Sequence, residues 1–301
     1  MSVKVAALAL VSLLAAGATW QSGPPLPLPR SEVAGALVSG RIAVVGGLLP
    51  DGQNSARVDA FDVRAQVWRR FPNLPVTVDH AMATSARGRL YVVGGYGSDR
   101  RPLGAGYVLA GGSWISLPAP PEARAAGGAA IVGTRLYVAG GVAPTGLART
   151  MLVFDLVRRR WAVVPGPTAR EHLAVTATGG RIYALGGRTA GFDTNTRLVE
   201  TYDPGTKRWS RLRPLPEARG GTGAAAVGAT ILSVGGEATT GTIPSVFALN
   251  TRTRRWRRLP NLPTPRHGLA VVAASGRVYA IGGGPEPGLH VSDANESLRV
   301  G

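Results

Sequence analysis

The 301-residue chain contains no cysteine, which excludes disulfide bonds, thiolate metal sites, cysteine nucleophiles and cysteine-linked cofactors. Lysine is almost absent as well, because Lys4 and Lys207 are the only two, and nearly all of the 34 basic residues are arginine. Acidic residues number only 17, so the formal net charge is +17. Such a charge attracts anionic polymers and lipid headgroups, although a GC-rich genome, which encodes arginine readily, explains the composition equally well.

Six tryptophans and six Gly-Gly pairs alternate along the chain. Consecutive tryptophans are 46 to 48 residues apart and consecutive pairs 46 to 49. The tryptophans are Trp20, Trp68, Trp114, Trp161, Trp209 and Trp256, and the pairs begin at Gly46, Gly94, Gly140, Gly186, Gly235 and Gly282. A fixed period of this length is typical of propeller blades. The chain is therefore predicted to repeat one blade six times.

Each unit predicts four short antiparallel strands. In one unit, strands at 173–176, 181–185 and 198–202 are followed by a fourth that opens at Trp209, with Gly-, Pro- and Asp-rich turns between them. The first strand has small residues because innermost strands crowd the axis. Gly-Gly permits close backbone approach or positive φ, and tryptophan is expected to fill the widening wedge between blades.

This pattern resembles the kelch repeat, in which an apolar strand ends in Gly-Gly and an aromatic residue precedes a tryptophan by seven positions. Tyr202, Asp203 and Trp209 match that signature fully, and the corresponding sites of the other internal units are Phe61, Tyr107, Phe154 and Leu249. The Gly-His and Trp-Asp pairs of WD40 repeats are absent. The resemblance covers residues 19–301 and implies an all-β, six-bladed propeller in one domain. The strand at Trp20 is expected to join the C-terminal blade and close the ring.

Residues 1–18 lie outside the repeat and predict a signal peptide. Lys4 precedes a ten-residue apolar run and a small-residue end at Ala16-Gly17-Ala18. We expect cleavage after Ala18, a periplasmic or secreted protein, and no membrane span in the mature chain. An uncleaved membrane anchor is the alternative.

Arginine stands sixteen residues before five of the six Gly-Gly pairs, and Val78 takes this place in the remaining unit. The five are Arg30, Arg124, Arg170, Arg219 and Arg266. Blade geometry would place them around the mouth of the axial channel, where guanidinium groups could bind a carboxylate or phosphate. Alternatively, they pair with loop carbonyls and with carboxylates such as Glu122, Glu171 and Glu217. Kelch repeats often have arginine here, which favours the second interpretation.

Two positions further along stand Glu32, His80 and His172, with Asp79, Glu171 and His267 in the adjacent position of their units. The predicted ligand-binding set is Arg30, Glu32, His80, Arg124, Arg170, His172, Arg219 and Arg266. Arg170, Glu171 and His172 are the candidates for acid–base catalysis, and the same side chains could equally be hydrogen-bonded loop residues. No nucleophile or metal-ligand spacing completes the group, so no metal and no cofactor is predicted.

The loops that follow Gly-Gly differ most and are expected to carry specificity. Their polar residues are Asp51, Asn54, Tyr96, Asp99, Arg100, Arg188, Asp193 and Asn195. The turns on the opposite face carry many arginines, which form either a solvated rim or a contact for anionic cell-surface polymer.

Two classes of function remain open. The leading hypothesis is a secreted, monomeric binding module that holds a protein or a carbohydrate, including an anionic one, on its arginine-bearing loop face. The alternative is an enzyme that resembles the exported sialic acid mutarotase, whose reaction needs an arginine for the carboxylate and an acid–base pair. A copper enzyme of the galactose oxidase kind is excluded because its thioether cofactor needs a cysteine. Nucleic acid is not an expected partner, because export removes the usual target and no aromatic ladder accompanies the charge.

Overall fold

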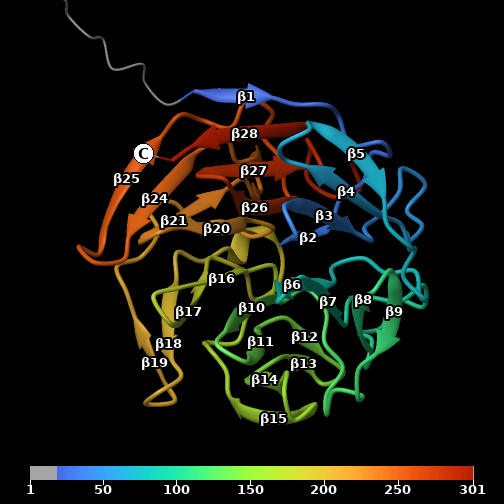
Figure 1. Cartoon of the computed structure of the whole chain (residues 1–301). Helices are drawn as coiled ribbons and strands as arrows, with labels where there is room; N and C mark the ends of the chain where they lie inside the picture. Colours follow the sequence, from blue (N-terminus) through green and yellow to red (C-terminus); the bar gives the residue numbers. More distant parts are fainter. Residues whose placement is uncertain (1–18, 301) are drawn as a thin grey trace, which may run out of the picture.

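The computed structural model describes residues 19–300. The predicted signal peptide lies outside these residues. In the described part, six four-stranded antiparallel sheets are arranged around a central axis as the blades of a propeller (Figure 1). No helix long and apolar enough to cross a membrane occurs among residues 19–300.

The blades follow one another in chain order, and within each blade the strands run from the axis outward. Blade 1 contains β2 (Ala34–Val38), β3 (Arg41–Val45), β4 (Val58–Asp62) and β5 (Val67–Arg70). Blade 2 contains β6 (Met82–Ala86), β7 (Arg89–Val93), β8 (Gly106–Ala110) and β9 (Ser113–Ser116). Blade 3 contains β10 (Gly128–Val132), β11 (Arg135–Ala139), β14 (Thr150–Asp155) and β15 (Arg160–Pro165).

The second half of the ring repeats this order. Blade 4 contains β16 (Ala174–Thr178), β17 (Arg181–Leu185), β18 (Val199–Asp203) and β19 (Arg208–Arg211). Blade 5 contains β20 (Gly223–Val227), β21 (Thr230–Val234), β24 (Val246–Asn250) and β25 (Arg255–Leu259). Blade 6 contains β26 (Ala270–Ala274), β27 (Arg277–Ile281), β28 (Asn295–Arg299) and β1 (Trp20–Ser22).

Three of the loops after Gly-Gly have small elements of their own. Two form short hairpins and one forms a 3₁₀ turn: β12 (Val142–Ala143) with β13 (Gly146–Leu147), β22 (Glu237–Ala238) with β23 (Gly241–Thr242), and η1 (Phe192–Thr194).

The two ends of the chain close the ring in one blade. Strand β1 pairs antiparallel with β28, and Trp20 lies opposite Leu298 (Figure 1). The Trp20 Nε1 donates a hydrogen bond to the carbonyl of Pro260, at the end of blade 5, at 3.0 Å. This confirms the predicted closure and leaves blade 6 with the same four strands as the others.

Neighbouring blades are joined by a repeated hydrogen bond that explains the Gly-Gly pairs. The second glycine of each pair donates its N–H to a carbonyl at the arginine position of the next blade, at 2.8 to 2.9 Å. The six bonds run from Gly47 to Val78, Gly95 to Arg124, Gly141 to Arg170, Gly187 to Arg219, Gly236 to Arg266 and Gly283 to Arg30. The first glycine is as tightly placed, because a Cβ on Gly94, at φ +59°, would lie 2.0 Å from the Arg124 carbonyl oxygen. A larger residue is therefore excluded by contact as well as by backbone conformation.

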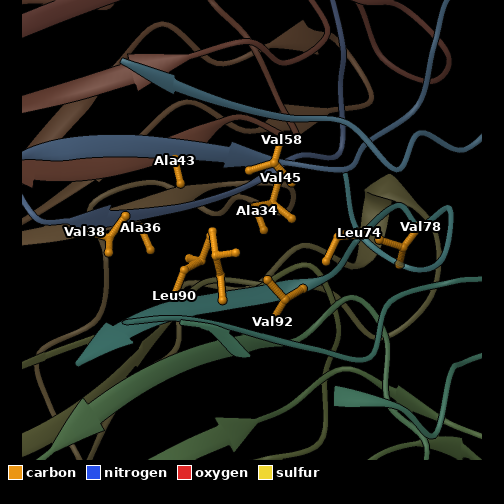
Figure 2. Packing of buried hydrophobic residues seen from close by; sticks show 11 residues of the cluster. Ala34, Ala36, Val38, Ala43, Val45, Val58, Leu74, Val78, Leu90 and Val92 are labelled. Carbon is orange, nitrogen blue, oxygen red and sulfur yellow. The ribbon is translucent and has the colours of Figure 1, made fainter. Parts of the chain in front are cut away.

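The apolar core lies between facing sheets. Side chains of β2 and β3 in blade 1, such as Ala36 and Val45, face Leu90 and Val92 of β7 in blade 2 (Figure 2). The six tryptophans lie further out and are only partly buried. Each donates its Nε1 hydrogen to a carbonyl at the outer end of the preceding blade, at 2.8 to 3.1 Å. Tryptophan therefore joins neighbouring blades through both packing and a hydrogen bond.

Blade 2 differs from the predicted repeat in one register. Leu109, and not Tyr107, lies opposite Trp114, because a two-residue turn joins β8 to β9. Both turn residues, Gly111 and Gly112, have positive φ, as the tight hairpin turn requires. Tyr107 therefore occupies the place that Asp59 and Glu200 have in blades 1 and 4, two residues before the residue that pairs with tryptophan.

Candidate functional site at the axial mouth

Six residues, one before each innermost strand, form a closed ring around the propeller axis. We call them the axial ring: Glu32, His80, Ala126, His172, Gly221 and Gly268. Each of the last five donates its backbone N–H to the carbonyl of the preceding member, at 2.8 to 3.1 Å, and the Val33 N–H closes the circle on Gly268 at 3.1 Å. All six have positive φ, between +49° and +64°. Backbone geometry thus fixes the ring before any side chain is considered.

Residues other than glycine rarely have positive φ, so the side chains present in this ring need an explanation. Glycine serves at two of the six positions, and a residue with a Cβ costs roughly 1–2 kcal/mol in this left-handed conformation. Glu32, His80 and His172 nevertheless keep polar side chains there. Non-glycine residues with positive φ outside the ring lie in turns and loops, such as Ser39 and Gln66, whereas these three polar side chains lie together at the axis. Backbone strain that holds polar side chains together in this way supports a functional site.

Two hollows meet at the axial ring. On the loop side is a cavity of about 570 Å³, which we call the mouth cavity, lined by Glu32, Leu48, Gly52, His80, Tyr96, Arg100, His172, Arg188, Phe192, Glu237, His267, Gly288 and Leu289. On the other side, a channel of about 140 Å³ runs between the innermost strands and is lined mostly by glycine, alanine and valine. Glu32, His80 and His172 line both hollows. These three ionisable side chains therefore lie at the junction of the cavity and the channel.

His80 and His172 point at each other across the ring. Their Nε2 atoms are 2.9 Å apart, and His80 Nε2 is 3.0 Å from Glu32 Oε2. On the other side of each imidazole stands a carboxylate: His80 Nδ1 bonds to Asp79, and His172 Nδ1 lies 3.4 Å from Glu171 Oε1. The same arrangement of carboxylate and histidine thus occurs twice in one site.

Arginines hold the two outer carboxylates. Arg100 Nη1 donates to Asp79 Oδ2 at 2.9 Å, while Arg188 Nε lies 3.4 Å from Glu171 Oε1. Arg188 also donates to Glu237 Oε1 at 2.7 Å and lies over the Phe192 ring at 4.9 Å. Both guanidinium groups of the mouth are therefore committed to carboxylates of the protein.

His267 joins the cluster through Glu32. Its Nδ1 lies 3.0 Å from Glu32 Oε1, and its Nε2 lies 3.0 Å from the Glu286 carbonyl. A Cβ on Gly268 would lie 2.5 Å from the Glu32 carboxylate. The small ring position at Gly268 thus makes room for Glu32.

The pKa values follow these contacts. Burial opposes the charged form of His80, but Glu32 and then Asp79 outweigh it and raise its pKa above the usual value. Burial dominates at His172 and lowers its pKa. At Glu32, burial favours the neutral acid, yet the nearby histidines, His80 foremost, hold its pKa well below the usual range. Glu32 is therefore an ionised carboxylate in the axial ring.

The five arginines predicted to surround the mouth lie elsewhere. Arg30, Arg124, Arg170, Arg219 and Arg266 all have 0 % exposed surface, and the residues that line the mouth cavity do not include them. Each donates to the carbonyl of the first glycine in its own Gly-Gly pair. The structure corrects their expected position, and the alternative interpretation, pairing with carbonyls and carboxylates, describes them.

Each buried arginine has one acid, supplied in one of two ways. Asp59, Glu200 and Glu296 reach Arg30, Arg170 and Arg266 from the third strand of the blade. Glu122 and Glu217 reach Arg124 and Arg219 from two residues earlier in the chain. In four of the five units a threonine or serine also bonds to the acid: Thr150 to Glu122, Thr168 to Glu200, Ser245 to Glu217 and Thr264 to Glu296. Burial lowers the pKa of Arg30 and Arg219 to about 10, which leaves both charged at neutral pH.

Among the predicted catalytic residues, Glu171 and His172 lie at the mouth and Arg170 does not. The ionisable side chains that line the mouth cavity and are not in the predicted ligand-binding set include Arg100, Arg188, Glu237 and His267. Arg188 and Glu237 stand directly after their Gly-Gly pairs, as Tyr96 does. The residue at this repeat position forms a β-bridge with the residue just before the axial ring, as Tyr96 does with Asp79 and Arg188 with Glu171. That shared position is the signal in the sequence that identifies them.

Charge at the mouth differs from that of the whole chain. Glu32, Asp79, Glu171 and Glu237 line or back it, against the two guanidinium groups of Arg100 and Arg188. Carboxylates thus outnumber arginines in a protein of net charge +17. The mouth is a histidine–carboxylate site and not the anion-binding ring of arginines expected from the sequence.

Comparisons with known proteins agree with this architecture. The family described as KLHDC2/KLHL20/DRC7 Kelch-repeats domain matches residues 32–214 and 119–284. Kelch-like protein terF of Aspergillus terreus is 30 % identical over 254 residues, which cover 76 % of this chain and 55 % of that protein. Kelch-like protein 34 of Homo sapiens is 32 % identical over 240 residues, 72 % of this chain and 36 % of that protein.

Among solved structures, that of YjhT superimposes with a TM-score of 0.80 at 18 % identity, over 92 % of this chain and 97 % of that one. At this identity the likeness concerns the fold. The chain spans about half or less of the length of the curated relatives described above. By its repeats, blades and matches, it belongs to the kelch-repeat family.

Proposed function

We propose that this kelch propeller is a binding module that takes an exposed loop or terminus of a protein partner into the mouth cavity. The observation that carries the proposal is the cavity itself. Its volume of about 570 Å³ accommodates a few side chains, and its lining combines aromatic and apolar side chains with charged residues around the axial ring. Pockets that bind short segments have this combination of apolar walls and a few placed polar groups.

The rim supplies apolar contact area. Tyr96 and Phe192 are partly buried, and Leu289 is 49 % exposed. An inserted segment would cover these side chains, and aromatic residues at the centre of an interface contribute much of its binding energy. The loops that carry them are rigidly mounted, because each begins at a Gly-Gly pair that is bonded to the next blade.

Selection from a random peptide library tests the proposal. We expect peptides that bind the wild-type protein and lose affinity by about tenfold in Leu289→Ser, since the loss of an apolar contact worth about 1.4 kcal/mol weakens binding tenfold. The matched control is Val157→Ser. Val157 is 64 % exposed in the turn between β14 and β15, on the face opposite the mouth. Peptides that bind both variants equally well would contradict a site at the mouth.

A second candidate is a mutarotase for an acidic sugar, supported by Glu171 and His172 as an acid–base pair at the mouth. Arg170 is buried, so Arg100, which lines the mouth cavity with a side chain that is 58 % exposed, would be the group that meets the sugar carboxylate. Anomer exchange measured by NMR distinguishes the two functions, because it needs no protein partner. Equal exchange rates for wild type and His172→Ala would remove this candidate.

Export is the third part of the proposal. The apolar segment before Thr19 is the support, and the strand β1 begins at Trp20, directly after it. N-terminal sequencing of the expressed protein is expected to begin at Thr19, in the periplasmic or culture fraction. A cytoplasmic protein that retains residues 1–18 would contradict export.

A further inference from the structure

We propose that Glu32, His80 and His172 bind a divalent transition-metal ion at the centre of the axial ring. The ion would have two imidazole nitrogens and one carboxylate oxygen as protein ligands. Its remaining coordination positions would open into the mouth cavity. This site does not depend on the proposed partner.

The ligand atoms already lie at distances close to those around a metal ion. His80 Nε2 is 2.9 Å from His172 Nε2 and 3.0 Å from Glu32 Oε2, and the three ligand atoms all lie within 4.8 Å of one another. Two ligands that each bond to a metal at about 2.1 Å, at right angles to each other, are about 3.0 Å apart. Small rotations of the side chains would therefore suffice to surround an ion.

The three ligand atoms face one point that needs a positive charge. Asp79 bonds to His80 Nδ1, and Glu171 Oε1 lies 3.4 Å from His172 Nδ1, so the two Nδ1 atoms are turned to carboxylates. The two Nε2 atoms then face each other beside the Glu32 carboxylate. Either a proton on one Nε2 or a metal ion between the three atoms supplies the positive charge, and a metal ion would take the place of that proton.

The outer carboxylates match the usual surroundings of a metal-bound histidine. Such a histidine donates its other N–H to a carboxylate or carbonyl, which fixes the orientation of the ring. Asp79 and Glu171 have this place, and Arg100 and Arg188 hold them in turn. Asp79 makes this bond to His80, and Glu171 lies 3.4 Å from His172 Nδ1, where a small rotation of the side chain would form it.

The remaining ring positions leave space for the ion and its other ligands. Ala126, Gly221 and Gly268 contribute little or no side chain. The ring backbone is tied from blade to blade by hydrogen bonds, so the three ligands are mounted on a rigid frame. Preorganisation of this kind favours binding because little entropy is lost on coordination.

The ligand types select the class of metal. Two imidazoles and one carboxylate suit Zn²⁺ or Fe²⁺, whereas Ca²⁺ and Mg²⁺ prefer oxygen ligands alone. Three protein ligands with open positions are also typical of reactive metal sites and not of closed structural ones.

Titration of the chelator-treated, tag-free protein with Co²⁺ and with Zn²⁺ tests the proposal. We expect one equivalent of Co²⁺ to give visible d–d absorption, Zn²⁺ to displace it, and Tm to rise with Zn²⁺ concentration. His80→Ala and His172→Ala should each weaken Zn²⁺ binding by tenfold or more in calorimetry. The matched control is His290→Ala, because His290 is 46 % exposed on the loop after Gly283.

Two outcomes would overturn the proposal. One is a wild-type protein that gives no d–d absorption and no calorimetric binding of Zn²⁺, with NMR showing a proton shared by the two imidazoles in place of a metal. The other is binding that His290→Ala abolishes and His172→Ala leaves unchanged. The spectrum of the wild-type protein decides the question even where a histidine variant does not fold. Neither result bears on peptide capture, which is measured separately.

Discussion

Replacement of Arg170 by methionine tests whether the repeated arginines stabilise the blades. Arg170 has 0 % exposed surface and donates to four acceptors: the carbonyls of Gly186, Thr168 and Ala184 at 2.6, 2.8 and 3.2 Å, and Glu200 Oε2 at 2.5 Å. Methionine fills much of the volume but donates none of these bonds. The variant would leave a buried carboxylate without its cation.

We expect Arg170→Met to lower the free energy of unfolding by about 3–5 kcal/mol, the usual cost of removing one partner of a buried ion pair. Four hydrogen bonds at about 1 kcal/mol net each give the same magnitude. For a domain of this size the loss corresponds to a fall in Tm on the order of 10 °C. Arg158→Met is the matched control, because Arg158 is 64 % exposed and should change stability by less than about 0.5 kcal/mol.

Blade 2 supplies a second control. Val78 and Tyr107 occupy the positions of Arg170 and Glu200 there, so one blade folds without this ion pair. The double variant Arg170→Val, Glu200→Tyr copies that arrangement and should recover at least half of the lost stability. Urea unfolding of wild type, of Arg170→Val, of Glu200→Tyr and of the double variant gives the coupling between the two residues.

A stabilising role of the buried ion pair would be refuted if Arg170→Met lowered the free energy of unfolding by less than about 1 kcal/mol, the range of an exposed pair. It would also be refuted if the double variant were as unstable as the two single variants added together. In either case the buried arginine would not be what stabilises its blade.

Three further predictions concern other repeated features. Gly94→Ala should destabilise by more than about 3 kcal/mol because its Cβ meets a carbonyl, while Gly133→Ala, at nearly the same φ but with open space around it, should cost only about 1 kcal/mol in urea unfolding. Hydrogen bonds from backbone N–H groups, that of Gly205 foremost, lower the pKa of Asp203 in the folded protein. The ionised carboxylate therefore stabilises the fold at pH values above the pKa of the unfolded chain, about 3.9, and this stabilisation is lost as the pH falls through the lower pKa of the folded protein. Asp203→Asn, the natural choice at Asn250 of blade 5, should remove that part of the pH dependence of the urea midpoint. Trp20→Ala should cost about 1–3 kcal/mol, because this side chain is only partly buried, and should expose the amides of β28 to hydrogen exchange. Unchanged protection of β28 would contradict closure by β1.

Much of the fold could be predicted from spacing alone. Tryptophan and Gly-Gly recur because every blade meets its neighbour through the same indole and the same backbone contact, and both contacts are confirmed. The register of blade 2 could not be predicted in this way, because Gly111 and Gly112 form a turn that is shorter than the corresponding turn in the other internal blades. A count of seven residues therefore selects Tyr107 where Leu109 pairs with Trp114.

The candidate site could be predicted only in part. Glu32, His80 and His172 share one repeat position, and the structure brings them together. The arginine position, equally regular, is misplaced by the sequence pattern, because its guanidinium groups turn inward to carbonyls that exist only once the strands are paired. The sequence identifies Arg188 only as a polar residue of a variable loop and does not identify Glu237, because the relation of both residues to the axis depends on bridges between loop and ring.

The amino-acid sequence by itself determined the number of blades, the order of the strands and the closure of the ring, since a local pattern repeated at fixed length can bury its apolar face only by stacking against copies of itself. Tertiary structure alone decided which polar repeat positions face the axis and which are buried in a blade. Residues as far apart as Glu32 and His267 contact only when the sixth blade returns to the first. No periodicity within a single unit encodes the direction of a side chain that is fixed by the next blade.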